Sequence, residues 1–234
     1  MHWFPCECVM LCHYNIIAAG VFWMFLSLLA AKYLNAINFY PCFMRFIIEH
    51  LDPEVFRWCE LEYKHISLVV SEENVVFTNV RSGADKLSGR IEEKSVKELK
   101  PDFGKICILD PKAKKTLSPD DASLFDSFLF GGVLGNHPMD GRTEKELSAQ
   151  MPDCEIRNLG DVQMSTDTAV LVAKRILVDK IPFDKLEFKD EIEIELDDGF
   201  SNILPYRYLI EDGKPVLPYG LIDYLMHEDE TNQM

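Results

Sequence analysis

Short, wholly apolar runs alternate along this chain with segments in which apolar residues recur every three or four positions. Such runs, bounded by polar or turn-forming residues, are typical of strands in a parallel sheet that is buried on both faces. The pattern predicts five strands, at Phe46–Ile48, Val75–Thr78, Ile106–Leu109, Phe128–Phe130 and Glu155–Arg157. Helical segments separate them, so we expect an α/β fold whose parallel sheet is covered by helices on both faces.

Two segments have the period of an amphipathic helix. The first is expected to begin at Asp52–Glu54, where Asp is a common N-cap, Pro fits the first turn and Glu favours the positive helix end. The second is expected to begin at Ser165 or Thr166. The polar segment Ser82–Lys100 predicts a loop with a short helix near Val96–Leu99. The predicted apolar faces comprise Phe56, Cys59, Tyr63, Ile66 and Val70 in the first helix and Ala169, Val172, Ala173 and Ile176 in the second.

The pattern changes after Lys180. Acidic and apolar residues alternate through Glu187–Asp198, as in a strand with one exposed face. Pro205–Leu209 and Gly213–Leu217 complete a small β appendage, followed by a short helix and a disordered acidic tail. We therefore divide the chain into a hydrophobic leader at 1–43, a core domain at 44–180 and an acidic C-terminal appendage with its tail at 181–234.

The leader allows more than one interpretation. Residues 1–43 hold one acid, Glu7, and one base, Lys32, and are uncharged from Val9 to Ala31. Since roughly 20 apolar residues cross a bilayer, the leader is a marginal transmembrane candidate, whereas a signal peptide would need basic residues near its start. The alternative is an upstream or mispredicted start, because Met44 directly precedes the first strand. We expect contact with a membrane only if the leader is retained.

Charge and cysteine content limit the partners and the compartment. The net charge is −15, and all of it lies beyond residue 43 because the leader sums to zero. Nucleic-acid-binding proteins normally present a basic patch, so RNA is disfavoured as a substrate and a cationic partner is favoured. Solubility alone would also account for an acidic balance. The cysteines form no paired CxxC motif and predict no metal site, and we expect the reduced thiols of a cytoplasmic protein at Cys59, Cys107 and Cys154.

Three strand ends carry the candidate chemistry, at Leu109–Pro111, Gly131–Pro138 and Leu159–Thr168. The carboxyl ends of parallel strands meet at one edge, where open α/β sheets bind their ligands. Glycines at 131, 132, 135 and 160 would let the backbone approach a ligand and adopt positive φ. The pattern contains neither a GxGxxG fingerprint nor a P-loop. It therefore predicts a cofactor enzyme with a small-molecule site built from backbone, without specific support for a dinucleotide or a nucleoside triphosphate.

Four blocks of the chain resemble those of a known family. Ile108–Ala113, Leu117–Pro138, Arg157–Ala169 and Leu204–Leu221 are similar, in order and spacing, to the signature blocks of SPOUT-class methyltransferases related to the fungal family that methylates an arginine of a small-subunit ribosomal protein. The likeness extends from about Met44 to about Leu225. It implies an α/β sheet with a C-terminal trefoil knot, which no strand pattern could reveal and which the general rarity of knots disfavours. It also implies bound S-adenosylmethionine.

The resemblance places this cofactor against the three strand ends. Leu109 would line the adenine side, the glycines after residue 130 would form a wall, and the loop at 159–168 would be the knotted one. His137 with Pro138 can equally serve only to stiffen its loop. The implied cofactor-binding residues are Leu109, Asp110, Pro111, Gly131, Gly132, Leu134, Gly135, His137, Leu159, Gly160, Gln163, Met164, Thr166 and Thr168.

An arginine methyltransferase needs carboxylates near the cofactor. A guanidinium is protonated below a pH of about 12 and its lone pair is delocalised, so a carboxylate that holds it and localises its charge helps it to attack. The candidate catalytic residues are Glu49, which ends the first strand and is our first choice, then Asp110 and Asp167, with Asp161 also considered. Asp167 also suits the first turn of a helix. Arg157 is expected to pair with a carboxylate rather than to act in the chemistry.

We therefore expect a protein arginine N-methyltransferase that acts on a ribosomal protein, whose basic surface the acidic appendage would attract. An RNA methyltransferase of the SPOUT class is the alternative within enzymes. A non-catalytic, cofactor-binding scaffold for a basic partner is the alternative outside them. The sequence leaves open whether the protein is a monomer or a homodimer, which arginine is modified and how many methyl groups are added.

Overall fold

The computed structural model describes residues 44–133, 141–195 and 201–231. The predicted leader at 1–43 therefore lies outside the described residues, as do Leu134, Gly135 and His137 of the implied cofactor site. Within the described ranges, no helix is both long enough and apolar enough to cross a membrane.

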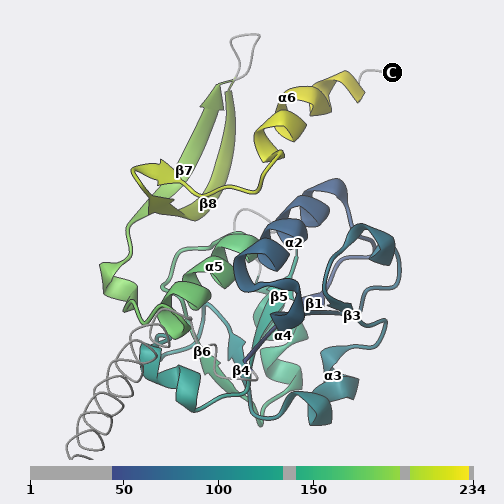
Figure 1. Cartoon of the computed structure of the whole chain (residues 1–234), viewed down its shortest axis with the longest axis vertical. Coiled ribbons are helices and arrows are strands. Elements are labelled where there is room, and N and C mark those ends of the chain that lie inside the picture. The colour runs from purple at the N-terminus through teal and green to yellow at the C-terminus, as the bar shows by residue number, and fades with distance from the viewer. Residues whose placement is uncertain (1–43, 134–140, 196–200, 232–234) are drawn as a thin grey trace, which may run out of the picture. The chain divides into compact units, whose positions relative to one another are not determined.

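In the described part of the chain, a six-stranded sheet has the order β3-β2-β1-β5-β4-β6, and every neighbouring pair is parallel (Figure 1). All five strands predicted from the sequence are confirmed. The sixth, β3, lies in the segment expected to be a loop, and its two residues pair with β2 although they are too short and polar to form a pattern. The strands are β1 (Arg45–His50), β2 (Val75–Thr78), β3 (Arg90–Ile91), β4 (Ile106–Leu109), β5 (Ser127–Gly132) and β6 (Glu155–Arg157).

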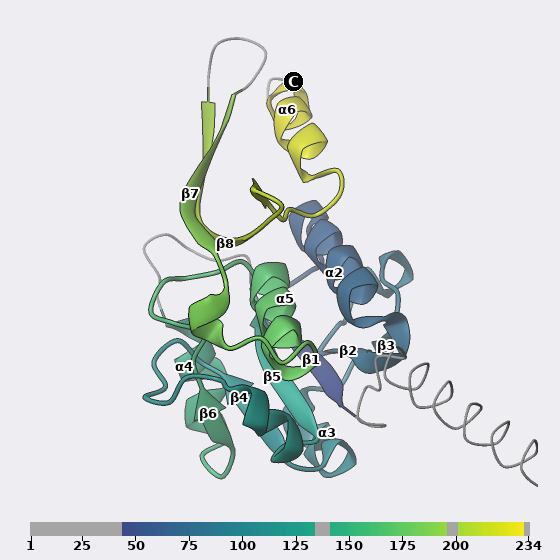
Figure 2. The same ribbon diagram turned by 60° about the vertical axis from the view of Figure 1, so that its left-hand side comes forward.

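Helices cover both faces of the sheet, as predicted. The long helices α2 (Arg57–Val70) and α5 (Thr166–Leu177) lie side by side on one face (Figure 2), where Phe46 and Phe77 pack against them. On the other face, α3 (Val96–Leu99) and the segment after α4 (Arg142–Glu146) pack on alternate residues of the same strands. Because successive residues of a strand point to opposite faces, each central strand must be apolar throughout.

The predicted start of α2 is wrong. The helix begins at Arg57, and its N-cap, Phe56, is extended and caps with no side chain. The residues directly after Asp52 are not helical, and its carboxylate instead accepts a hydrogen bond from Arg142 Nη1 at 2.6 Å, a partner 90 residues away that no local pattern predicts. Phe56, expected on the buried face, is 39% exposed. The N-cap predicted for α5 is confirmed at Ser165.

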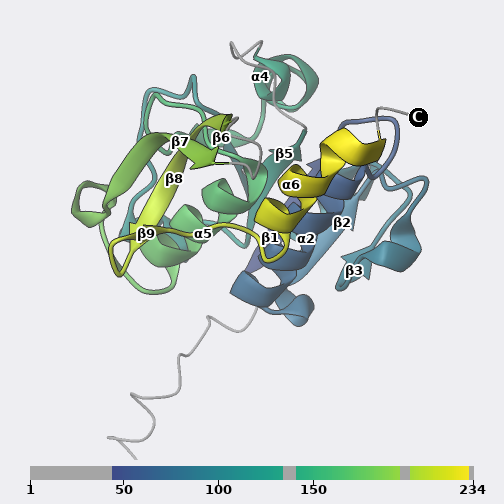
Figure 3. The same cartoon turned by 90° about the horizontal axis from the view of Figure 1, so that it is seen from above.

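The C-terminal segment forms a second, three-stranded sheet of order β7-β8-β9. It comprises β7 (Phe188–Glu195), β8 (Ser201–Glu211) and β9 (Lys214–Pro215), followed by α6 (Leu221–Thr231). The predicted alternation in β7 is confirmed, since Ile192 and Ile194 are buried between exposed glutamates. Seen from above, α6 lies along α2 (Figure 3), where Leu221 and Leu225 share a core with Leu61. The second sheet thus packs on the same helix that covers the first.

Candidate active site

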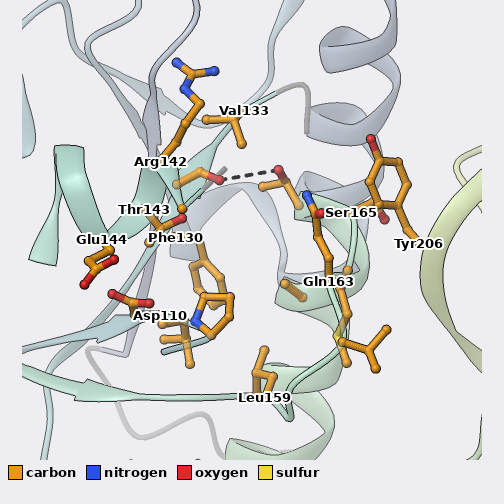
Figure 4. Close-up of a pocket in the computed structure, with 18 of the residues that line it drawn as sticks. Asp110, Phe130, Val133, Arg142, Thr143, Glu144, Leu159, Gln163, Ser165 and Tyr206 are labelled. Carbon is orange, nitrogen blue, oxygen red and sulfur yellow. Dashed lines mark hydrogen bonds between the residues drawn. The ribbon is translucent and has the colours of Figure 1, made fainter. Parts of the chain in front are cut away.

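A pocket opens at the carboxyl ends of β4 and β5 (Figure 4) and holds about 1060 Å³ of empty space, its open mouth included. The loop that leads into α5 forms one wall. Helix α2 and strand β8 contribute Trp58, Glu62 and Tyr206 to another. The edge of the parallel sheet at which the sequence predicts a ligand site is therefore hollow, in the manner typical of open α/β sheets.

The structure brings most of the implied cofactor residues to this pocket. Gly132 and Thr168 are not among its lining residues, and both are buried behind it. Leu134, Gly135 and His137 lie outside the described residues. The implied residues that line the pocket are Leu109, Asp110, Pro111, Gly131, Leu159, Gly160, Gln163, Met164 and Thr166.

The glycines of the pocket serve different purposes. Gly160 has a φ of 89°, and a β-carbon there would lie 2.9 Å from Phe183 Cζ, so the loop requires glycine for conformation and space. The expectation of positive φ at Gly131 and Gly132 is wrong, because both belong to strand β5. A β-carbon at Gly132 would overlap the Tyr63 hydroxyl, so this glycine makes room for the packing of α2 on the sheet.

One half of the pocket is apolar. Leu109 and Phe130 come from the ends of the central strands, and Leu159 and Met164 come from the loop opposite (Figure 4). Strand β8 holds this loop in place, because the backbone N–H of Arg207 donates to the carbonyl of Gln163 at 2.8 Å. Apolar side chains on two sides of a pocket are typical of a site that receives an apolar ring system.

A buried acceptor lies in the same wall. Gln163 Oε1 is shielded from solvent and has no hydrogen-bond partner in the described structure. A buried amide oxygen without a partner is costly, so its presence in a pocket wall marks a place where a ligand can donate a hydrogen bond.

Glu49, our first choice as the catalytic carboxylate, does not line the pocket. It is 1% exposed, and its carboxylate accepts hydrogen bonds from Thr78 Oγ1 at 2.5 Å, Ser95 Oγ at 2.5 Å and the Val96 N–H at 2.8 Å. These donors belong to β2 and to the first turn of α3. The geometry therefore gives Glu49 a structural role, in which a negative charge at a helix start ties α3 to the sheet.

Asp110 lies in the pocket wall but is also occupied. Its Oδ1 accepts from the Lys112 N–H at 2.9 Å, and its Oδ2 accepts from Ser148 Oγ at 2.5 Å. These bonds shape the turn that follows β4. Arg157 pairs with carboxylates as expected, since its Nε lies 3.1 Å from Asp121 Oδ1 and its Nη2 lies 3.0 Å from Glu155 Oε2.

Asp167 lies just behind the pocket. It is 1% exposed, and it accepts from His65 Nδ1 at 2.8 Å and from Ser165 Oγ at 2.7 Å. Asp161, the further candidate, is exposed. The residue that sequence reasoning missed is the neighbour of Asp167 on α2, Glu62, which does line the pocket.

Glu62 is a carboxyl in an unusual environment. It is 5% exposed and accepts from Trp58 Nε1 at 2.8 Å, and Thr166 also donates to it. Burial, and next the negative charge of Asp167, raise the pKa of this carboxyl well above its usual range. A sequence signal existed, because Glu62 follows Cys59 by three residues and precedes Ile66 by four, which places a charged residue on the apolar face of α2.

The described residues contain no group of three or more His, Cys, Asp or Glu side chains arranged to hold a metal ion. The pocket is lined by backbone at the strand ends, by apolar and aromatic side chains and by Glu62.

Comparisons with known proteins agree on one family. A family model described as "Protein arginine N-methyltransferase SFM1-like" matches residues 45–232. Protein arginine N-methyltransferase SFM1 of Saccharomyces cerevisiae is 37% identical over 210 residues, covering 82% of this chain and 98% of the yeast protein.

Solved structures of the yeast arginine methyltransferase SFM1 are similar in fold. The one complexed with SAM has a TM-score of 0.73 at 35% identity and covers 80% of this chain and 92% of that one. The one complexed with SAH has a TM-score of 0.72 at 35% identity and covers 77% and 94%, respectively. The α/β fold with a parallel sheet, expected from the sequence, is confirmed, whereas the assignment to the SPOUT class and the trefoil knot stay predictions.

Proposed function

The chain belongs to the SFM1-like family of protein arginine N-methyltransferases, and from this premise we propose that it methylates an arginine of a basic, ribosomal protein. The enzyme class is an S-adenosylmethionine-dependent methyltransferase. The observation that carries the proposal is a pocket with two unlike halves. One part is lined by apolar side chains at the strand ends and the facing loop, and the other holds a buried carboxyl together with aromatic side chains.

The first half fits the cofactor. Leu109, Leu159 and Met164 would hold the adenine ring in the apolar part of the pocket, and Gln163 Oε1 offers a buried acceptor for an N–H group of the ligand. The positive φ of Gly160 turns the backbone of this wall along the pocket. When bound, S-adenosylmethionine supplies a methyl group on a sulfonium, which is activated for displacement without any acid or base from the protein.

The second half fits a guanidinium. A side chain that attacks the methyl carbon must lie in line with the bond that breaks, so positioning supplies most of the rate. Trp58 and Tyr206 line the pocket together with Glu62, and aromatic rings and a carboxylate can together receive a flat cation. A deep pocket also excludes water, which strengthens these electrostatic interactions.

A basic protein substrate is supported by charge on the second sheet. Edge strand β7 exposes Glu191, Glu193 and Glu195 along one face, and the whole chain carries a charge of −15. Such a surface attracts basic segments, which are common in proteins that bind ribosomal RNA, and it repels RNA itself. Methylation of RNA is the alternative, and the test of the proposal must distinguish it from methylation of a protein.

The test is a labelling experiment on the full chain. Purified protein is incubated with tritiated S-adenosylmethionine and cell extract, and parallel samples are treated with RNase or protease before counting. We expect label in a small basic ribosomal protein, resistant to RNase and lost with protease, as methylarginine on hydrolysis. A Gly160→Leu variant, whose side chain would run into Phe183, serves as the control that labelling requires an intact pocket.

Other outcomes contradict the proposal in distinct ways. Label in RNA would favour an RNA methyltransferase of the SPOUT class. An absence of label, with cofactor binding intact by calorimetry, would favour a scaffold that holds a basic partner. Label in a protein that is not ribosomal would keep the methyltransferase activity and overturn the proposed substrate.

A further inference from the structure

The acidic part of the pocket has no cation of its own. Glu62 and Asp167 are both buried and adjacent, yet none of the ion pairs formed by the described residues joins a lysine or arginine to either of them. The partner of Asp167 is the imidazole of His65, whose Nδ1 lies 2.8 Å from Asp167 Oδ2. Buried carboxylates are normally paired with a cationic side chain, so this arrangement favours binding of a cation from outside the protein.

Hydrogen bonds hold Glu62 in position, and aromatic side chains line the pocket with it. Trp58 Nε1 holds Oε1 from the same helix, one turn away, and Thr166 donates from the start of α5. Tyr206, from β8, lines the same pocket (Figure 4). Trp58 and Tyr206 thus line the pocket together with Glu62, and aromatic side chains favour a flat, weakly hydrated cation.

We propose that Glu62 is the catalytic carboxylate, which binds the guanidinium of the substrate arginine and takes up the proton that its nitrogen loses. The proposal rests on the proposed function and names the residue that performs it. In the transfer, the nitrogen lone pair forms the new N–C bond as the methyl–sulfur bond breaks with its electron pair to sulfur. The proton released from that nitrogen passes to a carboxylate oxygen of Glu62, which leaves a methylated guanidinium with a single charge.

Asp167 acts as a positioning residue in this scheme. Its charge makes the space around Glu62 more attractive to a cation, and Ser165 and His65 hold its two oxygens. Other titratable groups that interact with the pair are Tyr206 and Tyr208 of β8 and Cys59 and Tyr63 of α2, and burial raises the pKa of all four. A guanidinium placed against Glu62 would favour its ionised form, so binding of the cation should release a proton.

The first experiment measures binding without the cofactor. In the full chain with Trp3→Phe and Trp23→Phe, Trp58 is the remaining tryptophan and reports on the pocket by fluorescence. Methylguanidine and a basic peptide with one arginine are the probes. The same peptide with lysine in place of the arginine tests whether the planar shape of the guanidinium is required. We expect Glu62→Gln to weaken binding of the arginine peptide about 10- to 100-fold.

Glu60→Gln is the matched control. Glu60 lies two residues away on the same helix and is buried to a similar extent, but Arg57 and Lys64 already pair with it outside the pocket. This variant should bind the probes like the parent protein. Equal binding of the arginine peptide by Glu62→Gln and by the parent would overturn the proposal.

The second experiment follows the proton. Calorimetric titration with the arginine peptide in phosphate and in Tris, whose ionisation enthalpies differ, should show that binding releases protons. The release should disappear in Glu62→Gln and persist in Glu60→Gln. Proton release that is unchanged in Glu62→Gln would show that another group titrates and would contradict the assignment.

Turnover separates this inference from the proposed function. Glu62→Gln should lower kcat at least as strongly as it raises KM, and Glu62→Asp, which retains the charge but shortens the side chain, should restore part of kcat. If the parent enzyme methylates protein and Glu62→Gln does so equally well, only the assignment of Glu62 fails. If the parent labels no protein although its peptide binding depends on Glu62, only the proposed function fails.

Discussion

Two buried glutamates, Glu49 and Glu62, show how differently one side chain can behave in one fold. Glu49 accepts hydrogen bonds from three donors of neighbouring elements, which stabilise its charge in place. Glu62 faces a pocket beside the like charge of Asp167, and burial disfavours its charged form. Only the second arrangement leaves a carboxylate available to a ligand.

We predict that Glu49→Ala destabilises the protein, by about 1–3 kcal/mol, because Thr78, Ser95 and the Val96 N–H lose their common acceptor. Urea denaturation of the variant measures this loss. Glu155→Gln, an exposed position, should change the free energy of unfolding far less. A Glu49 variant of normal stability that binds cofactor and peptide but fails to turn over would restore Glu49 as the catalytic residue.

The raised pKa of Glu62 predicts a pH-dependent effect on stability. A carboxyl whose pKa is higher in the folded than in the unfolded protein contributes stability below its unfolded pKa and loses it as pH rises through the folded value. Glu62→Gln, which resembles the neutral form, should therefore raise Tm at pH 8 and have little effect near pH 4. Thermal melts across this range measure the difference. A lower Tm at every pH would mean that the charged form stabilises the fold.

At the scale of elements, the site depends on where strands end and on how tightly the connecting loops turn. The loop from β6 to α5 passes Gly160 at positive φ and is held by the backbone of β8 at Gln163. Helix α2 contributes to the pocket only because it lies beside α5 on the same face of the sheet. Elements that are distant in sequence thereby form one wall.

We predict that Gly160→Ala weakens cofactor binding about tenfold or more, because its β-carbon would contact Phe183 and displace the loop. Gly213→Ala is the matched control. Gly213 has a similar positive φ of 74°, but a β-carbon there would meet nothing within 4 Å. Both variants should lose stability from backbone strain, about 1 kcal/mol. Calorimetry with S-adenosylmethionine should separate them, and equal cofactor affinities would show that the contact with Phe183 is unimportant.

At the scale of the whole molecule, the second sheet is part of the active site rather than an addition to it. Strand β8 contributes Tyr206 to the pocket, and the core of this sheet includes Leu61 of α2. The same sheet exposes acidic side chains on β7. One segment of the chain can therefore complete the pocket and attract a basic substrate to it.

We predict that Glu191→Gln, Glu193→Gln and Glu195→Gln together raise KM for a basic protein substrate several-fold and make it less sensitive to salt, because steering by exposed charges is screened. Cofactor affinity should not change. The control carries the same number of substitutions at exposed acids away from β7, at Glu72, Glu73 and Glu93. Steady-state kinetics at low and high salt measure both, and equal effects would mean that only the total charge matters.

The sequence by itself determined the five main strands, the apolar faces of α2 and α5, and the three strand ends that line the pocket. Burial on both faces and helical period are local properties, which a linear pattern records. The resemblance of four blocks to a known family then pointed to the cofactor and the reaction.

Only the tertiary structure decided which carboxylate faces the pocket and where α2 begins. Asp52, predicted as an N-cap, pairs with Arg142 instead. Glu49, predicted as the catalytic carboxylate, accepts hydrogen bonds from donors of β2 and of the start of α3. Glu62 lies beside Asp167, which comes from a helix about 100 residues later. The position of a residue in the apolar repeat of a helix indicates that it is buried. The environment of a charged side chain, however, depends on neighbours that only the folded chain brings together. For this reason the carboxylate on the apolar face of α2 could be recognised as a candidate catalytic group only in the fold.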